Sequence, residues 1–591
     1  MGERIITLAN HLWGAEHIGG AVLAACFIAT GLYLTVRMGF PQVRYLGHAI
    51  AAAAGRFHRA GDPGEVTHFR ALSAALGGSM GIDAVVGVAA AISFGGPGAV
   101  FWLWVAAIAV MATKLAESTL AVHFRVTSPD GTVTGGPMTS IVKGMHRRLG
   151  FLGWVFAAAA VLASFGLGNM VQANAVAEQV HAASSRHLGF AVPHWAAGAV
   201  MAVLIALVVL GGIKRVAAVA SRLVPLLIVA YVIGAIAVVI AHWDRVPEAF
   251  STILGCAFSG TAATGGFVGA TLAQAIRWGL ARGAFSSEAG LGSSAIAHAA
   301  ARTAEPVRQG LVAMLEPVVD TLCVATVSAL AIVSTGVWQE RIEQRLDLED
   351  VTFYARPVTT PEEAAEESNV LNGVLRVRGG TILGTVSFFE GRSSVDRPFI
   401  LSPDGDGFGG ALLIQRGRLV GAQVDVPDRG LVPATPEERR GLGLRGEALA
   451  TGPTLAAAAF ERAFPGVGGV FVTVALVLFA FATALSWCAY GDRCVGFLFG
   501  FKAVLPYRIL FCAAHVLGAI VAVRVVWAAA DVALALMAVP NLLCLWALAP
   551  LAAQLRRQYF GLAPKTSEAG EGEGEPSQKG RAGRSRSKRR G

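Results

Sequence analysis

The stretch Gly77–Trp104, GGSMGIDAVVGVAAAISFGGPGAVFWLW, combines features that one membrane helix rarely carries together. It is largely apolar, yet four glycines interrupt it between positions 77 and 87, and Asp83 adds a carboxylate. Close helix packing would explain the glycines, because small residues let two backbones approach. It would not explain Asp83. The alternative is a discontinuous helix, in which unwound carbonyls coordinate a cation and free N–H groups face a substrate carboxylate.

The rest of the chain shares this apolar character. Of its 591 residues, 54% are hydrophobic and 15% are charged, with a mean hydropathy of +0.59. Apolar spans of the length that crosses a bilayer, roughly 20 residues, are expected at 15–36, 70–94, 98–122, 150–178, 194–212, 216–241, 261–281, 310–337, 465–489, 506–527 and 530–554. These eleven spans predict an all-α polytopic membrane protein, with the lipid bilayer as its surroundings.

The basic residues predict an orientation. They gather after the first, third, fifth, seventh and ninth spans, as Arg56 and Lys143 illustrate, and basic connections are usually cytoplasmic. The N-terminus is then expected outside the cell and the C-terminus inside. We attribute the basic charge to the membrane, and nucleic acid is not expected as a partner.

Residues 339–450 form an insert unlike the spans. They hold 18 acidic residues against 13 arginines, and this negative charge agrees with an extracytoplasmic location. Short apolar runs between Gly, Pro and Asp turns predict a small β-rich domain, and SPDGDG (402–407) is either a hairpin turn or half of a calcium loop. No protein partner of the insert follows from its sequence. Helical regions at 1–338 and 451–557 flank it, and the low-complexity segment 558–591 predicts a disordered cytoplasmic tail.

Other function classes lack their sequence signals. No GxxxxGK[ST] phosphate loop and no Ser/His/Asp arrangement is present, so neither ATP-driven transport nor an enzyme is predicted. The seven cysteines lie in or beside apolar runs without metal-ligand spacing. No disulfide framework, and no metal beyond a coupling ion, is therefore expected.

A second glycine-interrupted segment begins TGGFVGATLAQAIRWG at Thr264 and continues to Ala300. Two interrupted spans at corresponding places in two halves point to an inverted-repeat transporter. Counted from span two, they are the first and sixth helices of a ten-helix core. The expected architecture is a 5+5 inverted repeat with discontinuous helices and one extra N-terminal helix.

A third polar site lies in FGLGNMVQANAV, where Asn169 and Gln172 are three residues apart and share a helix face. Hydrogen bonding between helices would explain either residue alone. Next to two broken helices, a substrate-facing role becomes the better hypothesis. Arg282 and Glu288 form either a gate ion pair or a loop salt bridge on the cytoplasmic side.

Several blocks resemble the sodium:alanine symporter (amino acid carrier) family. The matching blocks are GGPGAVFWLW at 95–104, GGPM at 135–138, GNMVQAN at 168–174, ARGAFSSEAGLGS at 281–293, VRQGLVAML at 307–315, the run at 485–511 and MAVPNL at 537–542. The resemblance covers almost everything except residues 339–450 and the tail. It implies a leucine-transporter-like fold and Na+-coupled uptake of alanine or glycine.

The chain departs from the family pattern at three places. Where the family has roughly GTVGTGN, this sequence has GSMGID and then Ala84, so an Asn that the resemblance makes a sodium ligand is missing. Ala482 replaces one of two hydroxyls in FAFAT, and Ser287 replaces an Asn. Asp83 offers a replacement, because a carboxylate can bind Na+, carry a proton or hold a substrate ammonium.

Together these arguments give candidate sites. Expected at the substrate are Ser79, Ile82, Asp83, Asn169, Gln172, Thr264, Gly265, Gly266 and Phe267. The resemblance implies a Na+ site at Gly77, Met80, Asp83, Ala84, Phe479 and Thr483. Arg282 and Glu288 complete the set as the gate.

The expected function is cation-coupled symport of small neutral amino acids across a bacterial plasma membrane, with Na+ as coupling ion and H+ as an alternative. A second hypothesis is a transport-impaired relative that senses a ligand or binds a partner through its insert.

Overall fold

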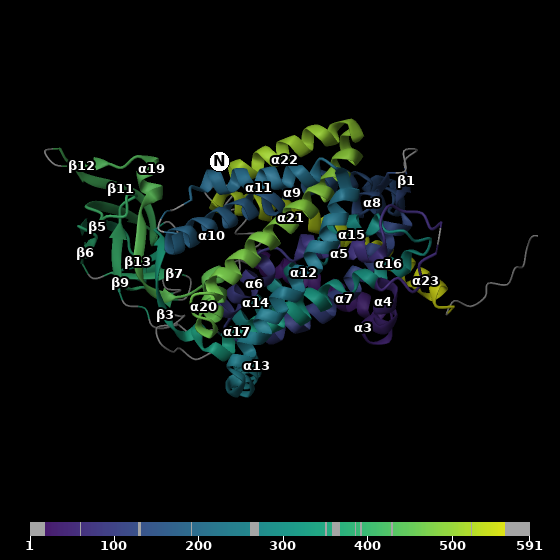
Figure 1. Cartoon of the computed structure of the whole chain (residues 1–591), viewed down its shortest axis with the longest axis horizontal. Helices are drawn as coiled ribbons and strands as arrows, with labels where there is room; N and C mark the ends of the chain where they lie inside the picture. Colours follow the sequence, from purple (N-terminus) through teal and green to yellow (C-terminus); the bar gives the residue numbers. More distant parts are fainter. Residues whose placement is uncertain are drawn as a thin grey trace, which may run out of the picture.

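The computed structural model describes residues 18–59, 61–127, 132–188, 190, 192–259, 271–348, 351–356, 358, 367–384, 386–390, 393–426, 429–521 and 523–561. Apolar runs become helices here because a helix bonds its own backbone N–H and C=O groups where no water is available. Strands occur almost entirely within the insert (Figure 1).

Most of the helices before the insert lie at predicted spans, but the helices at 246–259 and 272–286 do not match the span predicted at 261–281, part of which lies outside the described residues. The helices before the insert are α2 (Ile18–Arg37), α3 (Pro41–Arg44), α4 (Leu46–Ala53), α5 (His68–Ser79), α6 (Asp83–Gly95), α7 (Ala99–His123), α8 (Pro137–Gly144), α9 (Phe151–Phe165), the π-helical turn η2 (Gly166–Met170), α10 (Val171–Leu188), α11 (His194–Val209), α12 (Gly212–Ala241), α13 (Val246–Ser259), α14 (Leu272–Ser286), α15 (Ser293–Ala299), α16 (Pro306–Ala313), the π-helical segment η4 (Val318–Ala325) and α17 (Thr326–Thr335).

After the insert, α20 (Gly452–Ala463) leads into three long helices. These are α21 (Gly468–Phe499), α22 (Val504–Gly518) and α23 (Val523–Tyr559). Helix α21 packs against α5, α9, α10 and α12, so it lies among the helices of the first half of the chain.

Seven helical segments in the described part of the chain are long and apolar enough to cross a membrane. They are Ala99–His123, Arg147–His181, Gly212–Ala241, Pro306–Thr335, Gly468–Phe499, Phe501–Gly518 and Val526–Tyr559, and Val22–Arg37, Val85–Gly95 and His194–Val209 are shorter apolar helices. The protein is therefore mostly helical and polytopic, as predicted. The count of eleven spans and the inverted repeat stay predictions.

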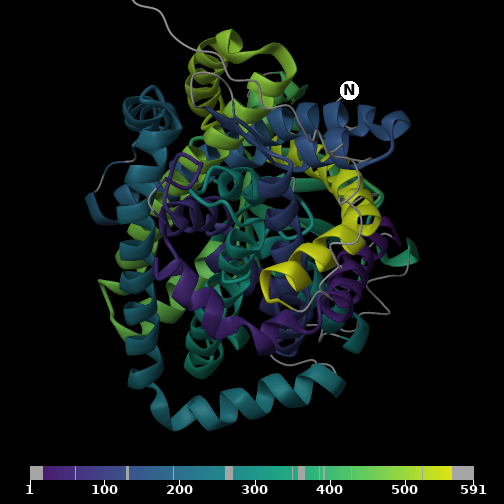
Figure 2. The same cartoon turned by 90° about the vertical axis from the view of Figure 1, so that its right-hand side faces the viewer.

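The bundle has two distinct ends. The strands of the insert lie at one end, which we call the insert end, and α3, α4 and the end of α23 lie at the other, the tail end (Figure 1). Figure 2 looks onto the tail end and shows α23 in yellow beside the purple N-terminal helices. There His48 Nε2 lies 2.8 Å from the Tyr559 hydroxyl, and Tyr45 stacks on Phe560 with ring centroids 4.1 Å apart.

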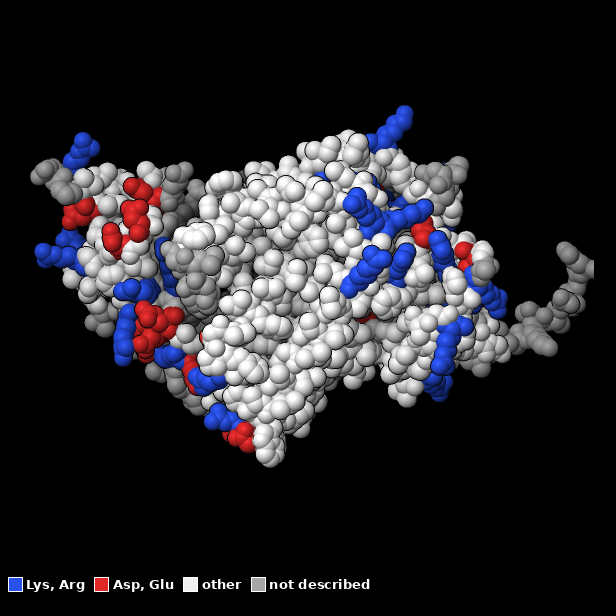
Figure 3. Space-filling model, viewed as in Figure 1, with Lys and Arg blue, Asp and Glu red and all other residues white. Residues whose placement is uncertain are grey.

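Charged side chains lie mainly at these two ends of the molecule. In the view of Figure 3 the helical surface between them is almost free of charged side chains, whereas Lys and Arg gather at the tail end. An uncharged band bounded by charged ends suits a hydrocarbon layer, since ions are costly within it.

The described part of the insert consists mainly of strands, together with the short helix α19 (Pro436–Gly441). The strands are β3 (Arg341–Asp347), β4 (Thr352–Tyr354), β5 (Gly373–Arg378), β6 (Thr381–Leu383), β7 (Ser387–Glu390), β8 (Ser393–Ser394), β9 (Asp396–Leu401), β10 (Gly410–Gln415), β11 (Arg418–Val426), β12 (Gly430–Pro433) and β13 (Gly443–Leu449). Outside the insert, the described strands are β1 (Val126–Thr127) and β2 (Val133–Thr134). The insert sheets have the orders β12-β11-β10-β5-β6, β3-β13-β9 and β4-β7-β8.

The two ends of the insert leave it side by side, because β3 pairs antiparallel with β13, with Arg341 opposite Leu449. Within the insert, the SPDGDG segment is a turn in which the Ser402 N–H donates to the Asp406 carbonyl at 2.8 Å. Among the residues that the structure describes, no cluster of three His, Cys, Asp or Glu side chains is arranged to hold a metal ion.

Candidate functional site

The first helix interruption lies where the glycine pattern predicts it. Helix α5 ends at Ser79 and α6 begins at Asp83, so residues 80–82 leave the regular helix. Met80 is fully buried at this point. The side chains of Asp83 and Ala84 lie outside the described part of the structure, so the predicted roles of both residues stay predictions.

Helix α21 approaches this interruption through Thr483. The Thr483 hydroxyl donates to the Gly77 carbonyl at 2.9 Å. A Cβ added at Gly81 would lie 2.7 Å from the Thr483 hydroxyl oxygen. The structure thus brings together two members of the predicted ion site, Gly77 and Thr483, from positions 406 residues apart. Phe479 is buried one turn earlier on α21, with its ring centroid 6.0 Å from that of Tyr231.

A second interruption is described at residues 287–292, within the predicted segment 264–300. Thr264, Gly265, Gly266 and Phe267 fall outside the described residues, and the regular helix runs on from Leu272 to Ser286 before it breaks at residues 287–292. The physical reason is a run of left-handed backbone, with φ of +52° at Glu288, +90° at Gly290 and +79° at Gly292. Helix α15 then resumes at Ser293.

Glu288 therefore belongs to this interruption and not to a loop between spans. One carboxylate oxygen accepts a hydrogen bond from the Ser293 hydroxyl at 2.5 Å, and the other accepts one from Trp487 Nε1 at 3.1 Å. Arg282 lies on α14 with its guanidinium carbon 5.8 Å from the centroid of the Trp278 ring. The two alternatives for Arg282 and Glu288, a gate ion pair or a loop salt bridge on the cytoplasmic side, stay predictions.

Asn169 and Gln172, predicted together, differ in their surroundings. In η2, the Asn169 amide nitrogen donates to the Phe511 carbonyl at 2.6 Å, and its oxygen accepts from His515 Nδ1 at 2.5 Å. Both ends of this amide thus serve packing against α22. Gln172 donates to the Leu167 carbonyl at 3.2 Å, while its buried Oε1 has no hydrogen-bond partner among the described residues.

The free oxygen of Gln172 faces the first interruption. A Cβ added at Gly81 would lie 3.3 Å from it. Ile82 is buried in the same interruption, and the Ser79 hydroxyl is turned back onto the Leu76 carbonyl at 3.4 Å. Of the predicted polar side chains, Gln172 is the one that offers an unused buried acceptor next to unwound backbone.

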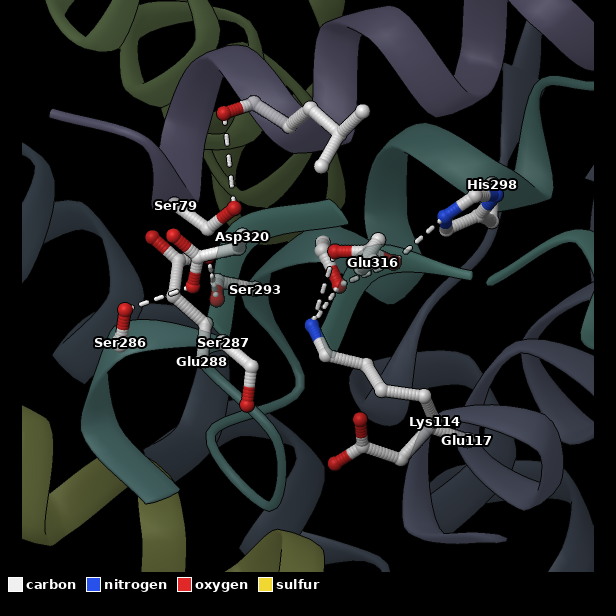
Figure 4. A network of polar contacts seen from close by, with 12 residues as sticks. Ser79, Lys114, Glu117, Ser286, Ser287, Glu288, Ser293, His298, Glu316 and Asp320 are labelled. Atoms are coloured by element: carbon white, nitrogen blue, oxygen red, sulfur yellow. Dashed lines mark hydrogen bonds and ion pairs between the residues drawn. The ribbon is translucent and has the colours of Figure 1, made fainter. Parts of the chain in front are cut away.

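Between the two interruptions lies a set of buried charges that the sequence reasoning did not select (Figure 4). Lys114 Nζ lies 3.0 Å from Glu316 Oε2, and the other oxygen of Glu316 accepts from His298 Nε2 at 2.7 Å. Glu117 Oε1 accepts from the Gly290 N–H at 2.8 Å. Their position in the sequence could have identified them. Each of these ionisable residues falls inside a predicted span or the second interrupted segment, and ionisable residues inside membrane spans usually have a functional role.

Comparisons with known proteins show to which family the chain is similar. The model of the sodium:alanine symporter family matches residues 4–356 and 442–571. An uncharacterised transporter of Haemophilus influenzae is 33% identical over 92% of this chain and 94% of its own length. The sodium/alanine symporter AgcS of Methanococcus maripaludis is 31% identical over 89% of this chain and 91% of its own length. A putative sodium/proton-dependent alanine carrier of Bacillus subtilis, YrbD, is 34% identical over 57% of this chain and 65% of its own length.

Proposed function

Because the chain belongs to the sodium:alanine symporter family, we propose that it is a cation-coupled secondary transporter of small neutral amino acids such as alanine or glycine. The observation that carries the proposal is the pair of helix interruptions, at residues 80–82 between α5 and α6 and at residues 287–292 between α14 and α15. Unwound backbone inside a membrane is tolerated where it lines a cavity or binds a ligand.

The substrate is expected to lie between the interruptions. Its carboxylate suits the free N–H groups where α6 and α15 begin, because helix N-termini attract anions. Its ammonium suits the unused Gln172 Oε1 and the carbonyls of the unwound segment. Ile82 and Trp487 are buried beside the two interruptions, and their apolar bulk favours a substrate with a small apolar side chain.

The coupling ion is expected where Thr483 meets Gly77. The residues fit Na+, because a hydroxyl and a carbonyl that now bond to each other at 2.9 Å are both hard oxygen ligands. Thr483→Val should raise the Na+ concentration for half-maximal uptake at least tenfold, whereas Thr483→Ser should stay near the wild type because it keeps the hydroxyl. Equal Na+ dependence in Thr483→Val and wild type would remove Thr483 from the ion site.

The function is tested by uptake of a radiolabelled amino-acid panel into proteoliposomes. Vesicles carry an inward Na+ gradient, an inward H+ gradient or neither, and ionophores that collapse each gradient serve as controls. Gradient-driven accumulation of alanine or glycine is expected. Equal uptake by protein-free vesicles would refute transport.

Asp83 is tested in the same vesicles as the group that compensates for Ala84. If Asp83 binds Na+ or carries the coupling proton, Asp83→Asn should abolish the response to one gradient and leave the other unchanged. Unchanged coupling in Asp83→Asn would show that Asp83 is not the coupling site.

A transport-impaired sensor is the second candidate, and two observations favour it. Residues 357–441 fall outside the family match, and the resemblance to the family leaves Ala84 where a ligand is expected. Amino-acid binding without net flux or exchange would select this candidate. Replacing residues 348–442 by a short turn between the paired strands β3 and β13 tests the role of the insert in either case.

The proposed orientation places the insert outside the cell and the tail end in the cytoplasm, because the basic residues gather at the tail end (Figure 3). Protease treatment of intact cells should then cleave within the insert only. Protection of the insert in intact cells and cleavage in inverted vesicles would reverse the orientation.

A further inference from the structure

We propose that Asp320 is a proton-binding carboxyl group of the transport cycle, which takes up and releases one H+ as the amino acid is carried. This inference rests on the proposed transport function and adds a titrating residue to it.

Asp320 is a fully buried acid in an irregular helical segment. It lies in η4, the π-helical segment between α16 and α17, and π-helical turns frequently mark functional sites. Its Oδ2 accepts hydrogen bonds from the Ser286 hydroxyl at 2.6 Å and the Thr321 hydroxyl at 3.4 Å. Its Oδ1 has no hydrogen-bond partner among the described residues, although it is buried.

The charges nearby leave Asp320 without a counter-ion of its own. Lys114 lies against Glu316 at 3.0 Å and donates its other described hydrogen bond to Ser294. The remaining carboxyls, Glu117 and Glu288, would add negative charge. An unpaired buried carboxylate costs several kcal/mol, and a bound proton removes that cost.

The partners of Asp320 suit a group that changes its protonation state. Ser286 and Thr321 are hydroxyls, which donate to a carboxylate and can rotate to accept from a carboxylic acid. Glu117 differs, because its Oε1 is held by the N–H groups of Gly290 and Asn541, which can only donate. Asp320 and Glu117 each have one carboxyl oxygen without a partner among the described residues, but only the partners of Asp320 fit both its carboxylate and its carboxylic-acid form.

Asp320 lies next to the second helix interruption, so its protonation can affect that segment. Ser286 is the last residue of α14, so its hydroxyl is attached to the chain just before the second interruption. In Figure 4, Asp320, Ser286 and Glu288 form one group, and Lys114, Glu316 and His298 form another. Loss of the proton would put an uncompensated negative charge beside the interruption and change its stability.

A pH effect at Asp320 has to be separated from its ionisable neighbours. The elements packed against η4 carry Lys114 and Glu117 on α7, Arg282 on α14 and Tyr231 on α12, and Glu288 at the interruption and Glu316 just before η4 are also ionisable. For this reason the test removes only the Asp320 charge and keeps its shape.

The test measures alanine or glycine uptake, whichever the wild type carries, into proteoliposomes between about pH 5.5 and pH 9. Binding of one proton changes the apparent affinity by at most about tenfold per pH unit, and the wild type should show this dependence over part of the range. Asp320→Asn, which mimics the protonated form, should flatten the profile. Ser328→Ala, which removes a buried hydroxyl from α17, is the matched control and should keep the wild-type profile.

An Asp320→Asn profile that matches the wild type overturns the inference while the transport function stands. If Asp320→Asn does not fold, Ser286→Ala replaces it, and an unmoved midpoint of its pH profile overturns the inference in the same way. If the wild type carries no amino acid, the proposed function fails, and infrared spectroscopy of the purified protein decides about the proton. A carboxylic-acid C=O band that Asp320→Asn removes supports a protonated Asp320, and its absence at neutral pH refutes it.

Discussion

The ion pair between Glu65 and Arg493 is expected to hold the tail end of the bundle closed. Glu65 precedes α5, and Arg493 lies near the tail end of α21. Arg493 Nη2 lies 2.8 Å and 3.0 Å from the two oxygens of Glu65, and the Val133 N–H donates to Glu65 Oε1 at 2.6 Å. The two charged side chains are only 4% and 6% exposed, so water screens them little.

Arg493→Met removes the positive charge and leaves Glu65 buried with one N–H donor. Breaking a buried pair in this way costs about 3–5 kcal/mol, because the remaining charge is uncompensated. The double variant Glu65→Gln, Arg493→Met should recover most of this loss, because the introduced glutamine would be neutral and its amide oxygen would still accept from the Val133 N–H. Thermal unfolding in detergent measures the order of stabilities of the wild type and the two variants.

A cysteine reporter measures the opening itself. Ala74 lines a small apolar gap between α5 and α21 together with Tyr490, and Ala74→Cys places a thiol there. If the pair holds the closed form, a loss of about 3 kcal/mol raises the open population up to about a hundredfold. Thiol labelling of Ala74→Cys should accelerate accordingly in the Arg493→Met background, with the parent protein, which keeps its own seven cysteines, as the control.

Two results would refute this reasoning. One is unchanged stability and labelling in Arg493→Met. The other is a double variant no more stable than the single one, since the loss would then not come from a stranded charge.

Three further changes test the packing around the interruptions. Gly168→Ala should destabilise the protein by about 1–3 kcal/mol or more and reduce uptake, because the added Cβ would lie 2.2 Å from Trp487 Cβ. Gly255→Ala is the control: its Cβ would meet nothing within 4 Å, so this variant should match the wild type in thermal unfolding and uptake. Trp487→Phe should cost about 1–3 kcal/mol through the lost donor to Glu288, and unaltered unfolding would show that this bond contributes nothing. Arg125→Lys should lower the unfolding temperature, because the guanidinium donates to four backbone carbonyls that one ammonium cannot reach together; an equal unfolding temperature would contradict this.

The sequence predicts the first interruption well because its cause is local. Four glycines and a carboxylate within one apolar run weaken a helix wherever that run packs. The break at residues 287–292 falls within the predicted segment 264–300, but its exact place could not be predicted, because it includes Glu288, whose φ of +52° cannot be inferred from its residue type. The glycines at 265–266 lie outside the described residues, so their role stays a prediction.

The remaining misses concern pairs formed over long sequence distances. Lys114 and Glu316 are 202 positions apart, so neither residue alone indicates its partner. Asn169 and Gln172 share a helix face in the sequence, yet only the fold shows that α22 takes up both ends of the Asn169 amide. Periodicity and neighbouring motifs identified Asn169 and Gln172 but not what each residue contacts, and they did not identify Lys114 or Glu316.

Gln309 gives the buried network a direction. Its Oε1 can only accept, so His68 donates to it through Nδ1 at 2.5 Å, and its Nε2 can only donate, so His298 accepts through Nδ1 at 2.5 Å. His298 must then carry its proton on Nε2, which faces Glu316 at 2.7 Å.

An amide relays a proton poorly, because its nitrogen would have to gain one and lose another. Gln309 therefore interrupts proton transfer between His68 and His298. It separates the Lys114–Glu316 pair from His68 at the start of α5. In a transporter that is driven by an ion gradient, such a barrier would hinder proton passage between His68 and His298, while the same contacts hold α5, α15 and α16 together.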